Sequence, residues 1–171
     1  HLAARTKIDL QAARDSIVAD FGVEVTIFSL DLSLGANVEQ LVNDCGDVDI
    51  LVNNAGAIPG GTIEEINEER WRTAWELKVF GYINMMRECY RMMKSRGRGV
   101  IVNVIGNAGN QAPAEYAAGV SADAMLEVLT RTLGGDSLDH GVRVVGISPG
   151  DLLNERGIMF LRRQAEEELG D

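Results

Sequence analysis

The sequence is poor in basic residues and contains no long apolar run. Its 16 Lys and Arg residues stand against 26 Asp and Glu residues, which leaves a formal net charge of -10. Proteins that bind nucleic acid need clustered Lys and Arg, so no nucleic-acid partner is expected. No apolar stretch approaches the roughly 20 residues that cross a bilayer, and none resembles a signal peptide. We therefore expect no membrane partner and a cytoplasmic protein.

The sequence also has few residues suited to holding a metal. It contains only two cysteines, Cys45 and Cys89, and they lack the spacing of metal ligands. We expect both to be small core residues in a reduced environment. The two histidines, His1 and His140, and the acidic clusters show no arrangement typical of a metal centre. No metal site is predicted.

Helical spacing of apolar residues alternates with short apolar runs along the chain. With 171 residues, 46% of them hydrophobic, the chain is long enough for one domain with a two-faced core. The expected helices are Lys7–Phe21, Asn37–Cys45, Glu64–Lys94 with a break near Gly81, and about Ser121 to Leu133; the expected strands are Val23–Leu30, Val48–Val52, Val100–Ile105 and Val142–Ile147. Such continuously apolar strands are typical of parallel sheets covered by helices on both faces. The sequence therefore predicts an α/β fold.

Small and polar residues follow these strands, at the edge where a parallel sheet binds its ligand. They are Asp31, Asn53–Gly56, Gly106–Gly109 and Pro149–Gly150. Glycine and alanine let a flat ligand approach the backbone, and asparagine stabilises turns. Four such segments in succession predict a ligand site at the carboxyl edge of the sheet.

Four stretches together resemble the short-chain dehydrogenase/reductase family. They are DILVNNAG at 49–56, DL at 31–32, GVIVNV at 99–104 and VRVVGISPG at 142–150. The resemblance covers nearly the whole chain and implies a Rossmann-type, doubly wound parallel sheet that binds NAD or NADP. The family's first strand and glycine-rich phosphate loop would precede His1, and its C-terminal helix and strand would follow Asp171. We interpret residues 1–171 as a single, partial dinucleotide-binding domain from the middle of a longer protein.

The resemblance assigns cofactor-binding roles to residues at the strand ends. By position these are Asp31 and Leu32 at the adenine, Asn53, Ala55 and Gly56 at the adenosine and ribose, and Pro149 and Gly150 at the nicotinamide. Arg5 stands at the end of the family's second strand, where arginine suits the extra phosphate of NADP and an acidic residue suits the ribose of NAD. We therefore expect NADP in preference to NAD, unless Arg5 is a solvated surface residue.

All four catalytic positions of the family are replaced in this chain. The family uses an asparagine, a serine, a tyrosine and a lysine, and counting along its motifs places Lys78, Gly106, Gly119 and Asp123 at those positions. Neither glycine has a side chain that donates a proton, and an anion at Asp123 would raise the pKa of a nearby phenol. The chain does have a tyrosine nearby, Tyr116, which lies three residues before Gly119.

Two alternative functions are compatible with a chain that keeps the family's binding motifs and replaces its catalytic residues. The first is an NAD(P)-dependent oxidoreductase that acts on an unidentified small alcohol or carbonyl compound. In it Tyr116, assisted by Lys78, supplies the proton, and Asn107 or Asn110 replaces the serine. The second is a catalytically inactive, nucleotide-binding protein that forms oligomers, because it keeps the binding motifs without the family's catalytic residues.

Lys78 and Asp123 are best explained together, because an unpaired charge buried at the site would be costly. In one arrangement the Lys78 ammonium pairs with Asp123 and stabilises the site. In the other arrangement the ammonium turns to Tyr116 and lowers the pKa of its phenol.

Apolar residues on two helices predict that subunits associate. In the family, the two corresponding helices form the interface between subunits, so we expect a homodimer or a homotetramer. The alternative is that these side chains are ordinary core residues. The residues concerned are Met85, Met86, Tyr90 and Met93 on the first helix, and Met125, Leu126 and Leu129 on the second.

Overall fold

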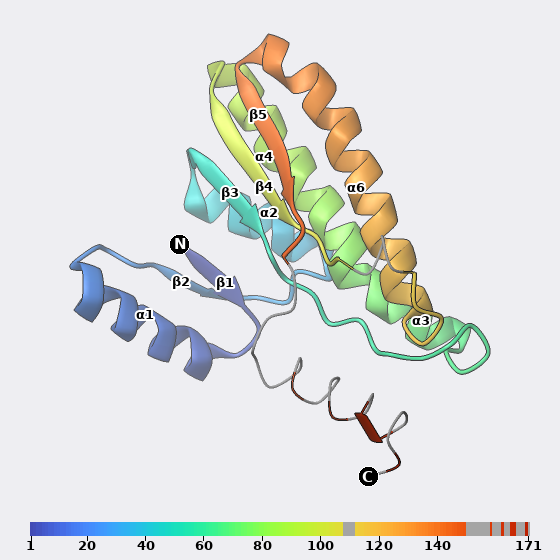
Figure 1. The fold of residues 1–171 in the computed structure, drawn as a ribbon. Coiled ribbons are helices and arrows are strands. Elements are labelled where there is room, and N and C mark those ends of the chain that lie inside the picture. Colours follow the sequence, from blue (N-terminus) through green and yellow to red (C-terminus); the bar gives the residue numbers. More distant parts are fainter. Residues whose placement is uncertain (108–111, 150–157, 159–161, 163–164, 167–169, 171) are drawn as a thin grey trace.

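The computed structural model describes residues 1–107 and 112–149, together with 158, 162, 165, 166 and 170. Its strands form two parallel sheets (Figure 1). The smaller sheet pairs β1 (Leu2–Ala4) with β2 (Ile27–Ser29), and the larger has the order β3 (Ile50–Asn53), β4 (Gly99–Val104) and β5 (Val142–Ile147). The predicted α/β fold with parallel strands is confirmed.

Helices connect the strands in sequence. They are α1 (Lys7–Phe21), α2 (Gly35–Cys45), α3 (Glu68–Trp75), the π-helical turn η1 (Glu76–Gly81), α4 (Tyr82–Arg96), α6 (Ala117–Ser137) and the short 3-10 helix η2 (Leu138–His140). Figure 1 shows α2, α4 and α6 on one face of the larger sheet. The expected break in the long helical region corresponds to η1, which ends at Gly81. None of the described helices is long and apolar enough to cross a membrane.

Local residues determine where several helices begin and end. α1 and α4 stop at Gly22 and Gly97, whose φ angles of 64° and 69° are left-handed and favour glycine. α3 begins after Asn67, whose side chain accepts a hydrogen bond from the backbone N–H of Arg70. α6 begins at Ala117, four residues before the expected start, so that Tyr116 is the residue directly preceding the helix.

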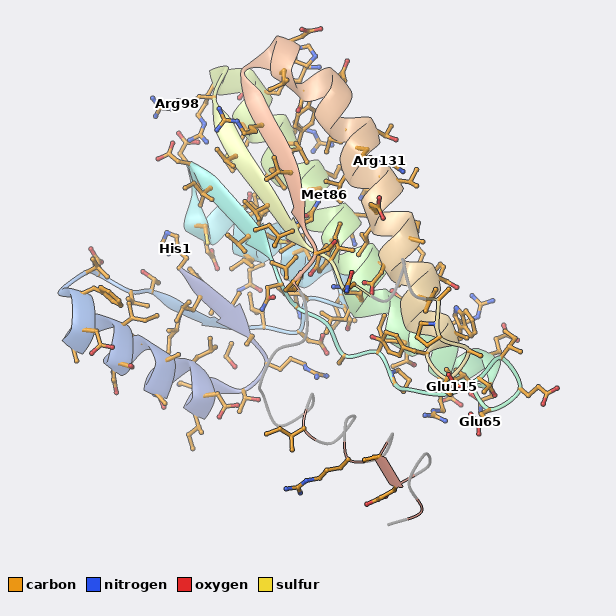
Figure 2. All side chains as sticks on the ribbon, viewed as in Figure 1. His1, Glu65, Met86, Arg98, Glu115 and Arg131 are labelled. Atoms are coloured by element: carbon orange, nitrogen blue, oxygen red, sulfur yellow. The ribbon has the colours of Figure 1, made fainter. Side chains whose placement is uncertain are left out.

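The main core lies between the larger sheet and its three helices. Figure 2 shows the labelled Met86 in this layer. The core contains Met85, Met86, Met93 and Leu126, each at most 8% exposed, and Tyr90, Met125 and Leu129 pack half-buried against it. The four buried residues are therefore core residues, as the alternative interpretation has it, whereas Tyr90, Met125 and Leu129 keep an exposed part, and for them the subunit interface stays a prediction. A helical apolar stripe looks the same in a sequence whether it faces a sheet or another subunit.

A second cluster joins α3, η1 and the start of α6. Ile66, Ala74 and Ala118 are buried in it, and the indole N–H of Trp75 donates to the Ala118 carbonyl at 3.1 Å. The loop before α3 is bound to the same region, because the Gly61 N–H donates to the Glu115 carbonyl at 2.6 Å. Figure 2 shows Glu65 and Glu115 at this end of the molecule. These contacts fix the backbone on both sides of Tyr116.

The two faces of β3 differ in exposure. Leu51 and Asn53 point toward the helices and are buried, whereas Ile50 and Val52 on the other face are 62% and 57% exposed. Val145 and Ile147 of β5 are 38% and 50% exposed. In the part of the chain that the structure describes, this face of the larger sheet is therefore open at both of its outer strands.

The contrast between Leu51 and Ile50 predicts unequal contributions to stability. Leu51→Ala removes buried atoms and is expected to lower the free energy of unfolding by about 2–5 kcal/mol. Ile50→Ala, the matched control on the neighbouring residue, removes atoms that already contact water, and we expect a loss below about 1 kcal/mol. Urea denaturation of the two variants measures the difference. Equal losses would contradict the described packing of β3.

Candidate functional site

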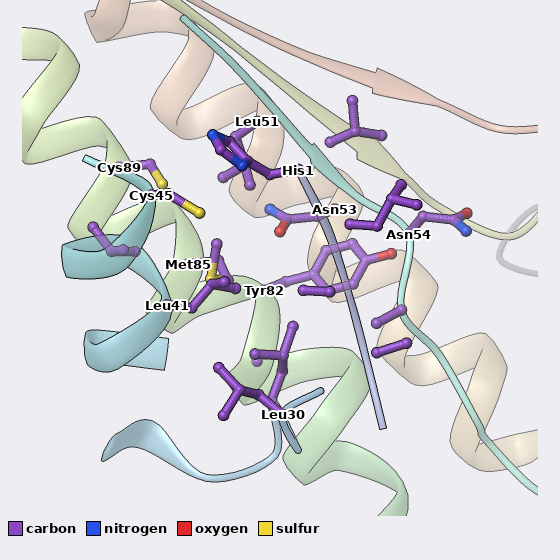
Figure 3. A pocket seen from close by; sticks show the side chains of 18 of the residues that line it. His1, Leu30, Leu41, Cys45, Leu51, Asn53, Asn54, Tyr82, Met85 and Cys89 are labelled. Carbon is purple, nitrogen blue, oxygen red and sulfur yellow. The ribbon is translucent and has the colours of Figure 1, made fainter. Parts of the chain in front are cut away.

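A groove of about 740 Å³ separates the two sheets where β1 faces β3 (Figure 3). Arg5 and Leu30 line it on the side of the smaller sheet, and Asn53 and Gly56 line it on the side of β3. Apolar side chains of α2 and α4, including Cys89, complete the lining. Burial raises the pKa of the Cys89 thiol to about 11, so this thiol stays protonated at neutral pH. This environment agrees with a core role for the cysteine.

The turn after β2 holds Asp31 in a fixed orientation. Its Oδ1 accepts hydrogen bonds from the Ser33 N–H at 3.0 Å and from the Ser33 hydroxyl at 2.8 Å, and its backbone carbonyl accepts from the Asn37 side chain at 2.9 Å. The two Ser33 bonds, and to a smaller extent the charge of Arg5, lower the pKa of the Asp31 carboxyl. Arg5 itself is exposed. Leu32 also lines the groove.

Asn53 ends a chain of buried polar side chains that crosses the larger sheet. Its Nδ2 donates to Oδ1 of Asn103 on β4 at 2.9 Å. Nδ2 of Asn103 donates to the Thr130 hydroxyl on α6 at 2.9 Å and to the Met86 sulfur at 3.1 Å. The chain connects β3, β4 and α6 directly behind the carboxyl ends of the strands.

Lys78 lies in η1, and its ammonium points to the end of β4. Nζ donates to the Val104 carbonyl at 2.9 Å and to the Tyr82 hydroxyl at 3.3 Å, and it lies 4.0 Å from Oδ1 of Asp123. The two charged side chains are only 12% and 4% exposed. The predicted ion pair is therefore present. Tyr82 donates its own proton to the Val104 carbonyl at 2.9 Å, and burial followed by the charge of Asp123 raises its pKa.

Asp123 occupies the space in which a side chain at position 106 would lie. Its Oδ1 accepts a hydrogen bond from the Gly106 N–H at 3.0 Å. A β-carbon added to Gly106 would collide with Oδ2 and would lie 2.9 Å from Cγ of the same carboxylate. Position 106 therefore requires glycine as long as Asp123 keeps this orientation.

Tyr116, directly before α6, and Gly119, in its first turn, show the same relationship. A β-carbon added to Gly119 would collide with Cε1 and Cζ of the Tyr116 ring. The ring of Tyr116 thus fills the space where the side chain of residue 119 would begin. Backbone bonds hold this arrangement, because the Tyr116 carbonyl accepts from the N–H groups of Gly119 and Val120 at 3.0 and 2.9 Å.

The structure brings together most of the residues that the sequence singled out. Lys78, Gly106 and Asp123 are in contact or within ion-pair distance, and Gly119 is covered by Tyr116. Arg5, Leu32, Asn53, Ala55 and Gly56 all line the groove. Asn107 and Pro149 follow β4 and β5 and lie outside the groove lining. Gly150 and Asn110 lie outside the described residues.

Three residues of the site were missed by the sequence analysis. They are Asn103, Thr130 and Tyr82. Asn103 gives a sequence signal, because it is the one polar residue in the run GVIVNV and a buried amide needs partners. Tyr82 follows Lys78 by four residues, a spacing that brings two side chains together on a helix.

Comparisons of sequence give a consistent set of similar proteins. The family profile described as short chain dehydrogenase matches residues 1–157. An uncharacterized oxidoreductase of Thermotoga maritima is 37% identical over 146 residues, and a sorbitol dehydrogenase of Cereibacter sphaeroides is 32% identical over 148 residues. Each alignment covers 84% of this chain and 57% of the relative, so the chain spans little more than half the length of these relatives.

Comparisons of structure agree with those of sequence. L-sorbose reductase from Gluconobacter frateurii, solved with NADPH and L-sorbose, matches with a TM-score of 0.88 at 28% identity, covering 99% of this chain and 66% of that one. NAD+-bound xylitol dehydrogenase gives 0.85 at 25% identity, with 96% and 66% coverage. A short chain oxidoreductase from Pseudomonas aeruginosa PAO1, described as having an atypical catalytic center, gives 0.83 at 29% identity, with 99% and 66% coverage.

The buried pair of Lys78 and Asp123 predicts a large cost for breaking it. Lys78→Met leaves a buried carboxylate without its cation and is expected to cost about 3–5 kcal/mol of stability. Adding Asp123→Asn removes that charge and keeps an acceptor for Gly106, so the double variant is expected to lose less than the sum of the single changes.

Arg72→Met provides the control for this cycle. It breaks the exposed pair of Arg72 with Glu68, which lies at 2.8 Å, and such pairs contribute only about 0.3–0.5 kcal/mol. Chemical denaturation of the four variants measures the coupling. Additive losses at Lys78 and Asp123 would show that their charges do not interact.

Proposed function

The chain belongs to the short chain dehydrogenase family, and from this premise we propose that the protein is an oxidoreductase acting on a small alcohol or carbonyl compound with NAD(P). Membership of this family supports oxidoreduction as the type of reaction. The two matched structures with bound NAD+ and NADPH support the class of cofactor. The substrate is proposed only as a class, because the chain spans about 57% of its curated relatives.

The carboxyl ends of β1 and β3, at one end of the groove, have features that a dinucleotide requires. Ala55 and Gly56 present little side chain beside it, so a flat ligand can approach the backbone there. Arg5 contributes a positive charge at the same groove, and Asn53 contributes a polar group on β3. We propose that these residues, together with Leu32 and the turn at Asp31, hold the cofactor. When bound, NAD(P) supplies or accepts the hydride.

Tyr116 is proposed as the group that moves the proton at the substrate oxygen. The observation that carries this role is the position of its ring, which lies where a side chain of residue 119 would begin. In this proposal, a tyrosine from the preceding turn takes the part of the family's tyrosine, whose position we assign to Gly119. The similar oxidoreductase of Pseudomonas aeruginosa, with its atypical catalytic center, supports the idea that rearranged sites occur among such proteins.

A catalytically inactive, nucleotide-binding protein is the second candidate. It is favoured by the contacts of Lys78, whose ammonium already interacts with Val104, Tyr82 and Asp123. An ammonium engaged in this way stabilises the fold of the site and has less influence on the pKa of another phenol. The two candidates differ in whether the protein turns over a substrate.

We propose that subunits associate through exposed residues of the helical layer, and not through the buried methionines of α4. Phe80 of η1 and Val128 of α6 are 46% and 53% exposed, and both belong to the helical layer beside the larger sheet. We propose a homodimer or homotetramer that uses this layer.

The proposed role of Tyr116 predicts loss of activity without loss of binding. Tyr116→Phe removes the proton donor, and we expect turnover to fall by about 10²–10⁴-fold while the affinity for NADPH is kept. Gly119→Ala introduces a β-carbon that collides with the Tyr116 ring, so it is expected to reduce turnover as well. NADPH oxidation and NADP+ reduction over a panel of carbonyls and alcohols provide the measurement.

Two variants control for general effects on the fold. Tyr90→Phe changes a tyrosine whose hydroxyl bonds only weakly to Asp136, at 3.4 Å, and Gly135→Ala adds a β-carbon on α6 that meets no atom within 4 Å. Both are expected to keep wild-type turnover. Full activity of Tyr116→Phe would refute the role of Tyr116. NADPH binding by the unmutated protein without any turnover would favour the inactive candidate.

The position of Arg5 predicts a preference between cofactors. A charge-assisted hydrogen bond contributes about 1.5–3 kcal/mol, so NADPH should bind at least tenfold more tightly than NADH. Arg5→Ala should remove most of this difference, and added salt should reduce it. Arg14→Ala, which removes a charge paired with Asp15 on α1, is the control that should leave the ratio unchanged. Equal affinities in calorimetry of the unmutated protein would exclude the NADP preference.

A further inference from the structure

We propose that Gly61 and Trp75 are positioning residues that hold the ring of Tyr116 over Gly119. In its consequence for turnover the inference rests on the proposed function, since it takes Tyr116 as the group that moves the proton. Gly61 and Trp75 both come from the segment between β3 and η1, and the sequence motifs assign neither of them to a site.

The backbone of Tyr116 is not helical, although this residue directly precedes α6. Its φ and ψ of -134° and 38° are neither helical nor extended. Its N–H donates to the Pro113 carbonyl at 3.2 Å, in the loop that leads to the helix. α6 binds only the carbonyl of Tyr116, so the direction in which the side chain leaves the backbone depends on contacts from other elements.

Gly61 binds both peptide groups that flank Tyr116. Its N–H donates to the Glu115 carbonyl at 2.6 Å, and its carbonyl accepts from the Ala117 N–H at 3.2 Å. The first bond holds the peptide plane before the α-carbon of Tyr116, and the second bond holds the plane after it. Because a peptide group is planar, two fixed planes determine φ and ψ of the residue between them. Gly61 thus sets the direction of the Cα–Cβ bond of Tyr116.

Position 61 admits a side chain only if this loop shifts. Gly61 has a φ of 144°, which favours glycine, and a β-carbon added there would lie 2.9 Å from Cγ1 of Ile66. Ile66 is buried in the second cluster at 5% exposure, so the loop has to move instead. A β-carbon added to the neighbouring Gly60 would meet the Glu115 carbonyl oxygen at an ordinary 3.6 Å. A methyl group at position 61, but not at position 60, should therefore disturb both hydrogen bonds.

Trp75 holds the residue on which the ring lies. Its indole N–H donates to the Ala118 carbonyl at 3.1 Å, and Ala118 is 0% exposed. This carbonyl belongs to the peptide group that leads into Gly119, which the Tyr116 ring covers. Trp75 and Tyr116 both pack against the second cluster, and Figure 1 shows α3 beside the start of α6. Gly61 therefore orients the ring, and Trp75 fixes the residue beneath it.

The position of the Tyr116 hydroxyl follows from these two supports. Cζ, which carries the hydroxyl, is one of the ring atoms that lie where a β-carbon of residue 119 would be. A shift of Gly61 or of the Ala118 carbonyl would move this atom relative to a bound substrate. Because a misplacement of about 1 Å can lower a rate by about 10²-fold, we expect loss of either support to lower turnover about tenfold. Binding of NADPH should be unchanged.

Nuclear Overhauser spectroscopy tests the position of the ring without any nucleotide or substrate. An α-proton of Gly119 points toward Cε1 and Cζ of Tyr116, so the unmutated protein should give a cross-peak between this proton and the ring protons. Trp75→Phe removes the indole N–H, and Gly61→Ala moves the loop, so each should abolish the cross-peak. Trp75→Phe keeps the test decisive if Gly61→Ala does not fold.

Two neighbouring residues provide matched controls. Trp71→Phe makes the same change in size one turn earlier on α3, in a side chain that packs against the same cluster, and it leaves the bond from Trp75 to Ala118 in place. Gly60→Ala adds a methyl group in ordinary contact. Both should keep the cross-peak and the wild-type kcat. In a merely structural role, Trp75→Phe and Trp71→Phe would lower the melting temperature alike, and both would keep the cross-peak.

The same variants are then assayed for kcat, KM and the Kd of NADPH, with the carbonyl compound of the panel that the unmutated protein reduces fastest. Trp75→Phe and Gly61→Ala should lower kcat about tenfold at unchanged Kd. Absence of the cross-peak in the unmutated protein, or an intact cross-peak in both variants, would overturn the proposal. A cross-peak lost in the variants with an unchanged kcat, or in a protein that turns nothing over, would refute the proposed function and leave the positioning of the ring established.

Discussion

The hydrogen bonds at the end of β4 hold the candidate site together. Asn103 joins this strand to β3 and α6, the Val104 carbonyl accepts from Lys78 in η1, and the Gly106 N–H donates to Asp123 on α6. A buried polar group left without a partner costs about 1–3 kcal/mol, so these bonds strongly constrain the surrounding elements. Three residues at and just after the end of β4 thus fix the relative positions of β3, η1 and α6. A substitution of Lys78, Asp123 or Asn103 would therefore also disturb the packing of these elements.

Two glycines show how tightly the site is coupled. At Gly106 the missing side chain leaves room for the Asp123 carboxylate, and at Gly119 it leaves room for the Tyr116 ring. In both places the space is filled by a neighbour on α6 or directly before it, so the packing density of the region is kept. Substitution of either glycine by a larger residue requires its neighbour to move. Gly106 with Asp123, and Gly119 with Tyr116, are therefore two pairs in which the size of one residue limits the other.

The sequence was sufficient to predict the boundaries of those elements whose residues have a strong local pattern. Lys7–Phe21 and Val142–Ile147 were predicted with the boundaries that the structure shows, because periodicity and the flanking residues agree there. The pairing of Lys78 with Asp123 also followed from the sequence, since two opposite charges at buried positions need one another.

Other features depend on tertiary contacts that the sequence does not display. The predicted start of α6 is too late, because Ala117–Val120 carry little periodic signal and the helix begins where Glu115 and Ala117, on either side of Tyr116, are hydrogen-bonded to Gly61. The methionines of α4 were assigned to a subunit interface, although they pack in the core. The partners of Asn103 come from β3, α4 and α6, and only the folded chain brings these elements together.

The charge of Asp123 determines what the tyrosines near it can do. Burial raises the pKa of Tyr82 and Asp123 raises it further, so Tyr82 keeps its proton and donates it to the Val104 carbonyl. A phenol that transfers a proton must pass through the phenolate, which a carboxylate opposes and an ammonium favours. At Tyr82 the carboxylate prevails, because the pKa of this tyrosine is raised although the Lys78 ammonium lies 3.3 Å from its hydroxyl. A phenol that transfers a proton close to Asp123 therefore does so against this carboxylate, at a higher pKa than it would have without it.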